Sequence, residues 1–500
     1  MRMFPPGSGA WIVRRGAWTL LPIVCLLAGC KPVGPNYNRP SYRTPPVYKG
    51  TGASSVVVPP PNPVGGGWQT ANPSDGMLRG KWWEIYGDPQ LDRLEDRIAT
   101  NNYQLRQALE TYLAARDEVS AVRANLFPML SAGPSISHQQ LSSNRPLASP
   151  FGGNTNYTDY QIGGQATWEP DFWGRIRRTV EAARATAQAS AADTANIDLS
   201  LHAEMASDYF QLRGLDAQTK LLTATVKDLE GQLGLTERRL AGGVANEADV
   251  AQARTQLESV RAQLVDVGVA RTQFEHAIGT IANYDLSSFS IPFSPLDLPL
   301  PKVPLGVPSQ LLERRPDIAS AERLTDAANA QIGIAVSAFY PTVGLGVAGG
   351  FESAHPGTWI QGPSSFWSLG GQAAELLFDA GQRHALTDQA RHAYEAQVAA
   401  YRNTVLFAFQ DVEDQLSSLR ILEQESGVEQ QAVSAAQYSF DISNQRYKGG
   451  VTSYLEVLTA EAILLQNQVT QINLQTRQFV ASVGLVRSLG GGWDVTQLPK

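Results

Sequence analysis

The chain has 500 residues, 43% of them hydrophobic, so it can bury a large core and disorder is not the expected state. Its net charge of −7 argues against nucleic acid as a partner, because phosphate binding needs clustered Lys and Arg. Six histidines and two cysteines leave little material for a metal site, and we expect neither a metal nor a catalytic centre.

The N-terminus has the pattern of an export signal. Arginines precede an apolar run over residues 18–28, which is too short for a membrane span but suits a signal peptide. The run ends in Leu-Ala-Gly-Cys30, and small residues before a cysteine resemble the bacterial lipobox. We therefore predict a lipoprotein signal peptide over 1–29, with diacylglycerol and an acyl chain such as palmitate on Cys30. Lys31 favours sorting to the outer membrane; the alternative is a plain signal peptide followed by an unmodified cysteine.

The next segment, residues 30–80, is rich in Pro, Gly, Ser and Thr and predicts an extended tether with little regular structure. Leucines at helical spacing then follow the start signal Asp88-Pro89. We expect one helical segment from there until Pro128 stops it.

Two long stretches contain no proline, residues 171–291 and 364–498. Because a proline inside a helix costs about 3 kcal/mol, such stretches rich in Ala, Gln, Leu and Glu favour very long helices. The first predicts one helix over 175–241, a hairpin tip at 242–246 and a return helix to about residue 282.

The second stretch repeats this plan. It predicts a helix over 381–447, a tip at 449–453 and a return helix to residue 489. The segments "RLAGGVANEADV" at 239–250 and "RYKGGVTSYLEV" at 446–457 share the same frame of Arg, Gly-Gly-Val and Val, 207 positions apart.

The two similar tips indicate an internal duplication. Repeat 1 covers residues 81–285 and repeat 2 residues 312–489, with a linking segment at 286–311 and a tail at 490–500. Upstream of the long helices the offset between the repeats is 213 instead of 207, so we expect a loop of variable length there.

Each repeat has a segment that is not helical, at about 128–173 and 341–379. In "YQIGGQATW" at 160–168 apolar residues alternate with polar or small ones, and "VGLGVAGGF" at 343–351 alternates with glycine. Each segment thus predicts a β-hairpin with one apolar face, a weak signature of transmembrane strands; the alternative is a hairpin packed on a soluble core. Since open edges are not tolerated in lipid, a cyclic trimer would have to share about twelve strands.

These motifs, in this order, resemble the outer-membrane factors of tripartite efflux pumps, the TolC-type channels, in the lipoprotein branch that serves resistance–nodulation–division pumps. The stretches that carry the resemblance are the lipobox, "VGPNYNRP" at 33–40, "WWEIYGDPQLDRL" at 82–94, "RRPDI" at 314–318, "SAFYPT" at 337–342 and "RYKGGVTSYLEVLTAE" at 446–461.

The resemblance implies a mixed, mainly α fold with membrane β structure. A duplicated protomer gives two β-hairpins, and thus four strands, to a trimeric 12-stranded outer-membrane barrel. Its long helices form a periplasmic α-barrel, and the tether and linking segment lie at the barrel's equator.

The implied function is not enzymatic. The homotrimer would sit in outer-membrane lipid, extend into the periplasm and act as a passive exit duct for drugs or other small toxic compounds. An inner-membrane efflux transporter and a periplasmic adaptor protein would deliver them. The same fold also serves type I protein secretion and metal-ion export, and a non-channel coiled-coil lipoprotein is the alternative from another class.

The resemblance also assigns the tips. The two turns face the adaptor and consist of Gly242, Gly243, Val244, Gly449, Gly450 and Val451. In relatives, acidic residues just past the second turn line the periplasmic aperture; Glu456 and its repeat mate Asp249 fall on such positions. Thr459 and Gln252 stand where some members have Asp, so these positions do not supply a second acidic ring here. The alternative is that both acids only complement helix dipoles.

Three further patterns receive structural interpretations. The formal GxGxxG that begins at Gly344 is followed by a loop and predicts strand packing, not nucleotide binding. Pro316 in "RRPDI" predicts a helix start. His392 and Glu395 lack further metal ligands at suitable spacing and predict an exposed helix face.

Overall fold

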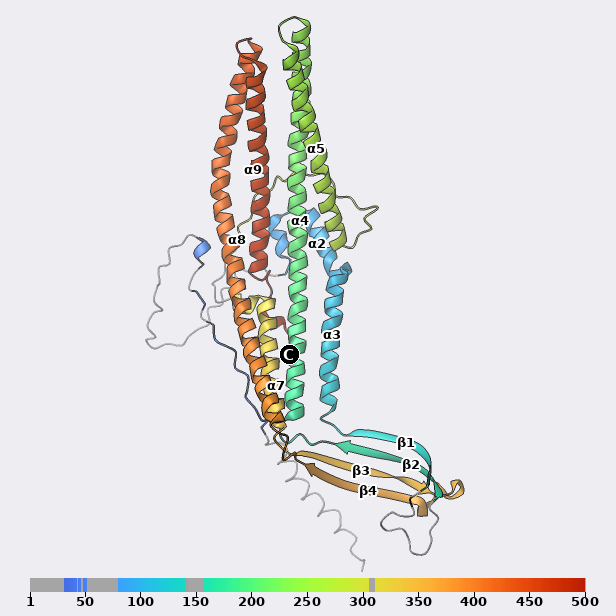
Figure 1. Ribbon diagram of the computed structural model, residues 1–500. Coiled ribbons are helices and arrows are strands. Elements are labelled where there is room, and N and C mark those ends of the chain that lie inside the picture. Colours follow the sequence, from blue (N-terminus) through green and yellow to red (C-terminus); the bar gives the residue numbers. More distant parts are fainter. Residues whose placement is uncertain are drawn as a thin grey trace, which may run out of the picture. The chain divides into compact units, whose positions relative to one another are not determined.

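The computed structural model combines long helices with one four-stranded sheet (Figure 1). It describes residues 31–42, 44, 45, 48–51, 80–140, 142, 156–304 and 311–499, so the predicted signal peptide and Cys30 lie outside the described residues. The helices and strands are α2 (Pro89–Asn101), α3 (Tyr103–Ala124), β1 (Met129–Gln140), β2 (Asn156–Trp168), α4 (Arg175–Ala241), α5 (Glu247–Ile281), α6 (Leu311–Arg314), α7 (Pro316–Ser337), β3 (Thr342–Ser353), β4 (Ser365–Ala374), α8 (Gln382–Lys448) and α9 (Tyr454–Ser488).

The chain forms two compact units that do not follow the repeat boundaries. Unit 1 draws on Met1–Pro40, Leu113–Ala189 and Glu322–Ala400, and unit 2 on Ser41–Tyr112, Ser190–Ala321 and Tyr401–Lys500. Each unit therefore contains parts of both repeats.

Unit 1 contains the sheet, whose strand order is β1-β2-β3-β4 with antiparallel neighbours. The β1–β2 and β3–β4 pairs are the two predicted hairpins, and the β2–β3 pair joins repeat 1 to repeat 2. The strands have the alternation that the sequence predicts, and the GxGxxG pattern from Gly344 lies within β3, as expected.

The duplication extends to the register of the hairpins. Met129 pairs with Thr167 in the first hairpin, and Thr342 pairs with Ala374 in the second. The shifts are 213 residues for the first strand and 207 for the second, so the length difference between the repeats falls in the hairpin loops.

The described start of the predicted tether is held firmly against the helices of unit 1. The buried Arg178 of α4 donates hydrogen bonds to the carbonyls of Val33 and Gly34 at 3.1 and 3.3 Å. Gly34 has φ +89°, and a Cβ there would come within 2.5 Å of the Cα of Gly333 in α7. Residues 32–36 are thus fixed by backbone hydrogen bonds and close packing, a contact that the composition of the segment does not predict.

Unit 2 contains most of the long helices, and Figure 1 shows α4 beside α5 and α8 beside α9. The helix predicted over 175–241 is confirmed, because α4 covers 67 residues without a break. Its repeat counterpart α8 also has 67 residues. The two return helices, α5 and α9, have 35 residues each.

One predicted helix is divided in two. The segment that starts at Pro89 ends as α2 at Asn101, and α3 begins at Tyr103. Asn102 causes the break, because its side-chain oxygen accepts the Leu105 N–H at 2.9 Å as a cap for α3. Its amide nitrogen also donates to the Ile281 carbonyl at 2.8 Å.

The linking segment of unit 2 is held by charged side chains. Arg213 and Arg271 donate to the carbonyls of Pro292 and Ile291 at 2.7 and 2.8 Å. Both arginines also bond to Asp216, which is fully buried. A buried carboxylate shared by two guanidinium groups is well compensated, so this network fixes the segment to α4 and α5.

Among the described residues, none of the helices is apolar enough over a sufficient length to cross a membrane.

Candidate functional site

The two tips in unit 2 have the same backbone. Gly243 and Gly450 both have φ +74°, a conformation that favours glycine. The next residues, Val244 and Val451, donate their N–H groups to carbonyls five residues back, at 2.8 and 2.9 Å. This is the Schellman ending of a helix, which explains why the chain has Gly-Gly-Val at both positions.

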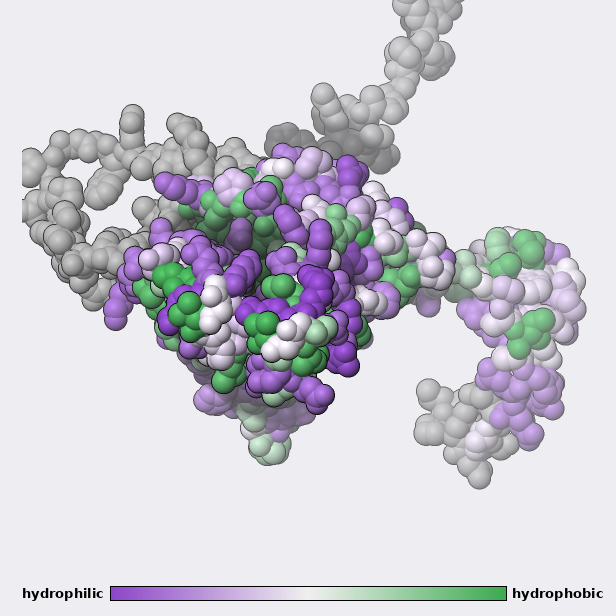
Figure 2. Space-filling model, turned by 90° about the horizontal axis from the view of Figure 1, so that it is seen from above, coloured by the Kyte–Doolittle hydropathy of each residue, from purple (hydrophilic) through white to green (hydrophobic). Residues whose placement is uncertain are grey.

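The tips present apolar side chains to solvent. Val244 and Val451 are each 70% exposed. Figure 2 looks onto the ends of the hairpins and shows green, hydrophobic surface set among purple, hydrophilic surface. Equivalent exposed valines on two neighbouring turns suit contact with an apolar partner surface.

The predicted aperture residues occupy equivalent positions with different bonds. Asp249 and Glu456 are the third residues of α5 and α9. The Asp249 carboxylate accepts the Asn246 backbone N–H at 3.2 Å, and the Asn246 side chain accepts the Asp249 N–H at 2.8 Å. Asp249 therefore closes a capping box, whereas the exposed Glu456 carboxylate has no hydrogen bond or ion pair among the described residues.

A second group of contacts, which the sequence reasoning missed, joins the hairpins close to the tips. Arg239 of α4 lies over the ring of Tyr447 of α8, 4.4 Å from its centroid, and donates to the Tyr447 carbonyl at 2.9 Å. The Arg446 side chain, at the equivalent position of repeat 2, is exposed.

Further along, Gln232 of α4 bridges two side chains of α9. It accepts the Tyr454 hydroxyl at 3.2 Å and donates to the Glu461 carboxylate at 3.0 Å. Tyr454 and Glu461 are 1% and 5% exposed, so this polar bridge lies inside the contact between the repeats. We name the set Gln232, Arg239, Tyr447, Tyr454 and Glu461 the interhairpin cluster.

Glu461 is the titratable centre of this cluster. Burial raises the pKa of Glu461 to about 7; the hydrogen bond from Gln232 opposes this shift and the nearby Asp228 adds to it. One carboxylate oxygen of Glu461 is buried without a partner among the described residues. A signal was present in the sequence, because Glu461 interrupts an apolar helical stripe with Val457 and Leu464.

The sheet of unit 1 has two chemically distinct faces. Cross-strand partners share a face, and one face carries apolar side chains on all four strands, including Leu130, Ile136, Ile162, Val347 and Leu369. The opposite face carries mainly Ser, Thr, Gln, Gly and two acids, Asp159 and Glu352, together with Met129, Tyr157 and Phe366 near the strand ends. The described strands have no Lys or Arg on either face.

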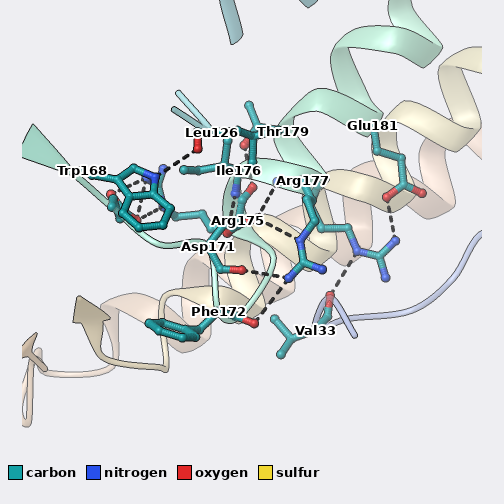
Figure 3. Close-up of polar contacts among 12 residues, drawn as sticks. Val33, Leu126, Trp168, Asp171, Phe172, Arg175, Ile176, Arg177, Thr179 and Glu181 are labelled. Carbon is teal, nitrogen blue, oxygen red and sulfur yellow. Dashed lines mark hydrogen bonds and ion pairs between the residues drawn. The ribbon is translucent and has the colours of Figure 1, made fainter. Parts of the chain in front are cut away.

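Polar contacts at the end of β2 involve the segment that follows α3 and the start of α4 (Figure 3). The Trp168 indole at the end of β2 donates to the Leu126 carbonyl at 3.0 Å. Asp171 accepts the backbone N–H groups of Ile176 and Arg177 at 3.0 and 2.9 Å, and thereby caps α4. In repeat 2, Asp379 accepts from Gly381 and Arg383 in the same way at the start of α8.

The other residues singled out in the sequence analysis belong to ordinary helix starts and exposed helix faces. Pro316 begins α7, as predicted, and His392 and Glu395 lie exposed on α8. In the described part of the chain, three or more His, Cys, Asp or Glu side chains nowhere gather as metal ligands.

The comparison with family models matches most of the duplicated region. Residues 94–283 and 307–491 match the family described as Outer membrane efflux protein. The two matched segments correspond to the two repeats.

Individual proteins show the same likeness. The chain is 33% identical over 420 residues to the Toluene efflux pump outer membrane protein TtgC of Pseudomonas putida, covering 82% of this chain and 85% of that protein. It is 30% identical to the Pyoverdine export outer membrane protein OpmQ of Pseudomonas aeruginosa, covering 85% and 90%. The solved structure of the outer-membrane channel OprN has a TM-score of 0.83 and 27% identity, covering 92% and 99%.

Proposed function

The chain belongs to the outer membrane efflux protein family and is an outer-membrane channel component of a tripartite efflux system, and from this premise we propose how its parts work. Three copies close one barrel of about twelve strands in the outer membrane, and their long helices continue the duct into the periplasm.

The observation that supports this assembly most directly is the sheet. One face is largely apolar and the other largely polar, and within the described part of the chain the outer strands β1 and β4 each pair on one side only. An open edge cannot persist in lipid, because unpaired N–H and C=O groups there cost several kcal/mol each. Closure with further copies satisfies the edges, directs the apolar face to lipid and leaves the polar face to line water.

The tips are the periplasmic end of the duct in this proposal. The exposed Val244 and Val451 contact the periplasmic adaptor, which connects the channel to the inner-membrane transporter. Asp249 and Glu456 line the closed aperture, and the interhairpin cluster holds the hairpins in that closed arrangement. Separation of the cluster opens the duct.

The anchor completes the proposal. Cys30 carries diacylglycerol and an acyl chain, and Arg178 fixes the chain only a few residues further on. The lipid is therefore held close to unit 1 and does not swing on a long tether. Cargo consists of small organic compounds, in keeping with relatives named for toluene and pyoverdine.

The test is ion conductance of the purified trimer in a planar bilayer. We compare the wild type with Asp249→Asn combined with Glu456→Gln, because these changes remove charge and keep size. The matched control is Glu247→Gln, which removes another exposed acid from the first turn of α5. We expect low conductance in the wild type and the control and a several-fold rise in the double variant. The reason is that carboxylates of like charge in a narrow ring bind cations and thereby keep the aperture in its closed arrangement.

Equal conductance in all three proteins would show a channel whose aperture is lined by other residues. A trimeric preparation that conducts in none of its variants would contradict the channel itself.

A further inference from the structure

The long helix α4 contains three glycines, and only one of them is required by close packing. A Cβ on Gly214 would come within 2.1 Å of the Thr476 hydroxyl oxygen of α9. A Cβ on Gly231 would meet nothing within 4 Å, and one on Gly234 would meet only the end of the Arg238 side chain, at 3.6 Å. Because glycine is among the poorest helix formers, Gly231 and Gly234 weaken α4 without allowing a closer contact within the chain.

A hydroxyl group disturbs the same stretch of α4. Thr236 is fully buried and donates its hydroxyl hydrogen bond to the Gln232 carbonyl at 2.9 Å. A bond of this kind, to the carbonyl four residues back, often bends a helix. Other threonines of α4 make the same bond, but Thr236 makes it within five residues of both Gly231 and Gly234. These features lower the cost of bending α4 at residues 231–236, which we name the weak segment.

The equivalent stretch of α8 lacks the two glycines. Tyr438 and Asp441 stand 207 positions after Gly231 and Gly234, and both are better helix formers than glycine. Asp441 also accepts a hydrogen bond from the Gln437 side chain at 3.0 Å, one turn earlier on the helix surface. The two helices have the same length but differ in stiffness at the same level of their hairpins.

The weak segment lies at the contact between the repeats. Gln232, inside the segment, accepts the Tyr454 hydroxyl and donates to the Glu461 carboxylate of α9. Arg239, just beyond the segment, bonds to Tyr447 of α8. The interhairpin cluster therefore ties α4 to repeat 2 within the weak segment and beyond it. While these bonds persist they keep α4 aligned, and their loss frees the weak segment to bend.

The packing of α4 against α5 differs on the two sides of the weak segment. Before the segment, Leu229 packs with Leu257 and Val260 in a buried cluster. Beyond it, Glu237 forms an ion pair with Arg254 at 3.2 Å, with both side chains about half exposed or more. Exposed ion pairs contribute little to stability. The helix is thus held firmly before the weak segment and more loosely beyond it, as a hinge requires.

We propose that residues 231–236 are the hinge of the channel. When the interhairpin cluster separates, α4 bends at the weak segment and carries the tip of repeat 1 away, while α8 stays straight. The inference rests on the proposed function and deepens it, because it identifies the hairpin that moves and the residues that absorb the change in backbone angles.

The test stiffens the weak segment without filling occupied space. The key variant combines Gly231→Ala with Gly234→Ala, since both added β carbons fit the structure. The matched control is Gly427→Ala, which removes an exposed glycine of α8 that also has no neighbour within 4 Å. Hydrogen exchange and single-channel recording are carried out on the full-length trimer in membranes.

In the wild type we expect the amides of the weak segment to exchange at least tenfold faster than those of residues 438–443. The key variant should slow exchange in the weak segment about 20-fold, because each alanine favours the helix about fivefold over glycine. Transient channel openings should become at least fivefold rarer in the key variant and remain as frequent as in the wild type in Gly427→Ala.

Three results would overturn the hinge and leave the channel intact. Exchange in the weak segment that is no faster than in residues 438–443 would show that α4 is not weak there. Slower exchange with unchanged openings would show that the channel opens by bending elsewhere. Loss of the trimer in the key variant would show that the two glycines contact a neighbouring copy. A wild-type trimer that never conducts would instead contradict the proposed function, and the hinge with it.

Discussion

The two hairpin tips have the same turn and different surroundings. Gly243 and Gly450 have the same φ, and both turns end their helices with the same hydrogen bonds. Repeat 1 nevertheless uses Asp249 to cap its own helix, whereas repeat 2 contributes Tyr447, Tyr454 and Glu461 to contacts with repeat 1. The two repeats therefore share the backbone of the turn and differ in their side chains. In repeat 1 the acid at the tip bonds within its own helix, whereas in repeat 2 side chains near the tip bond to the other hairpin.

The largest effect is expected from loss of the aromatic contact between the tips. Tyr447→Ala removes a buried ring under Arg239 and should cost about 3 kcal/mol of packing free energy. We predict a marked rise in single-channel conductance, because the two hairpins lose their main contact near the tip. The matched control is Leu240→Ala, the half-buried equivalent in repeat 1, which should change conductance far less. An equal rise in conductance in the two variants would mean that Tyr447 and Leu240 contribute equally to the contact between the hairpins.

The pH dependence of the cluster comes next in size. Since burial raises the pKa of Glu461 from 4.5 to about 7, the protonated acid supports the folded contact below pH 4.5. That stabilisation is lost as the pH rises through 7, at a cost on the order of 3 kcal/mol. Wild-type conductance should therefore rise between pH 6 and pH 8, and Glu461→Gln should be insensitive to pH there.

The control for this measurement is Glu237→Gln, which removes an exposed acid bonded to Arg254, the repeat mate of Glu461. Exposed pairs contribute little, so its pH profile should follow the wild type. A pH response that survives in Glu461→Gln would assign the titration to a group other than Glu461.

The shared turn predicts equal effects in the two repeats. Gly243→Ala and Gly450→Ala each place a Cβ at φ +74° and should each cost about 1 kcal/mol, since neither position has a steric neighbour within 4 Å. Amide hydrogen exchange in the last turns of α4 and α8 measures the loss of stability in the two variants. Gly242→Ala is the control, because its φ is not positive and a Cβ there makes only ordinary contact. Unequal exchange would show that the backbones of the tips are not equivalent.

The sequence predicts the local parts of this architecture well. Absence of proline and the Gly-Gly pairs define α4 and α8, and alternation defines the strands, because these features depend on neighbours along the chain. The tip turns follow from the same local rules.

Contacts between distant residues could not be predicted in this way. Gln232 and Glu461 are 229 positions apart, and Arg178 and Val33 are 145 apart. Such pairs depend on how long helices are rotated about their axes, which a pattern within one helix does not specify. Asn102 shows a related limit, because its second bond goes to Ile281, 179 positions away.

The smallest expected effect separates the two acids at the tips. Asp249→Ala removes one half of a capping box and should destabilise the first turn of α5 by about 1 kcal/mol. Glu456→Ala removes only an exposed charge near a helix start, with a cost of about 0.3 kcal/mol. Hydrogen exchange in the first turns of α5 and α9 should therefore rise clearly in the first variant and barely in the second. Asp249→Asn, which keeps an acceptor for the Asn246 N–H, should fall between Asp249→Ala and the wild type. If Glu456→Ala loosened α9 as much as Asp249→Ala loosens α5, Glu456 would also be a helix cap. The two tips would then differ only in the contacts of the interhairpin cluster.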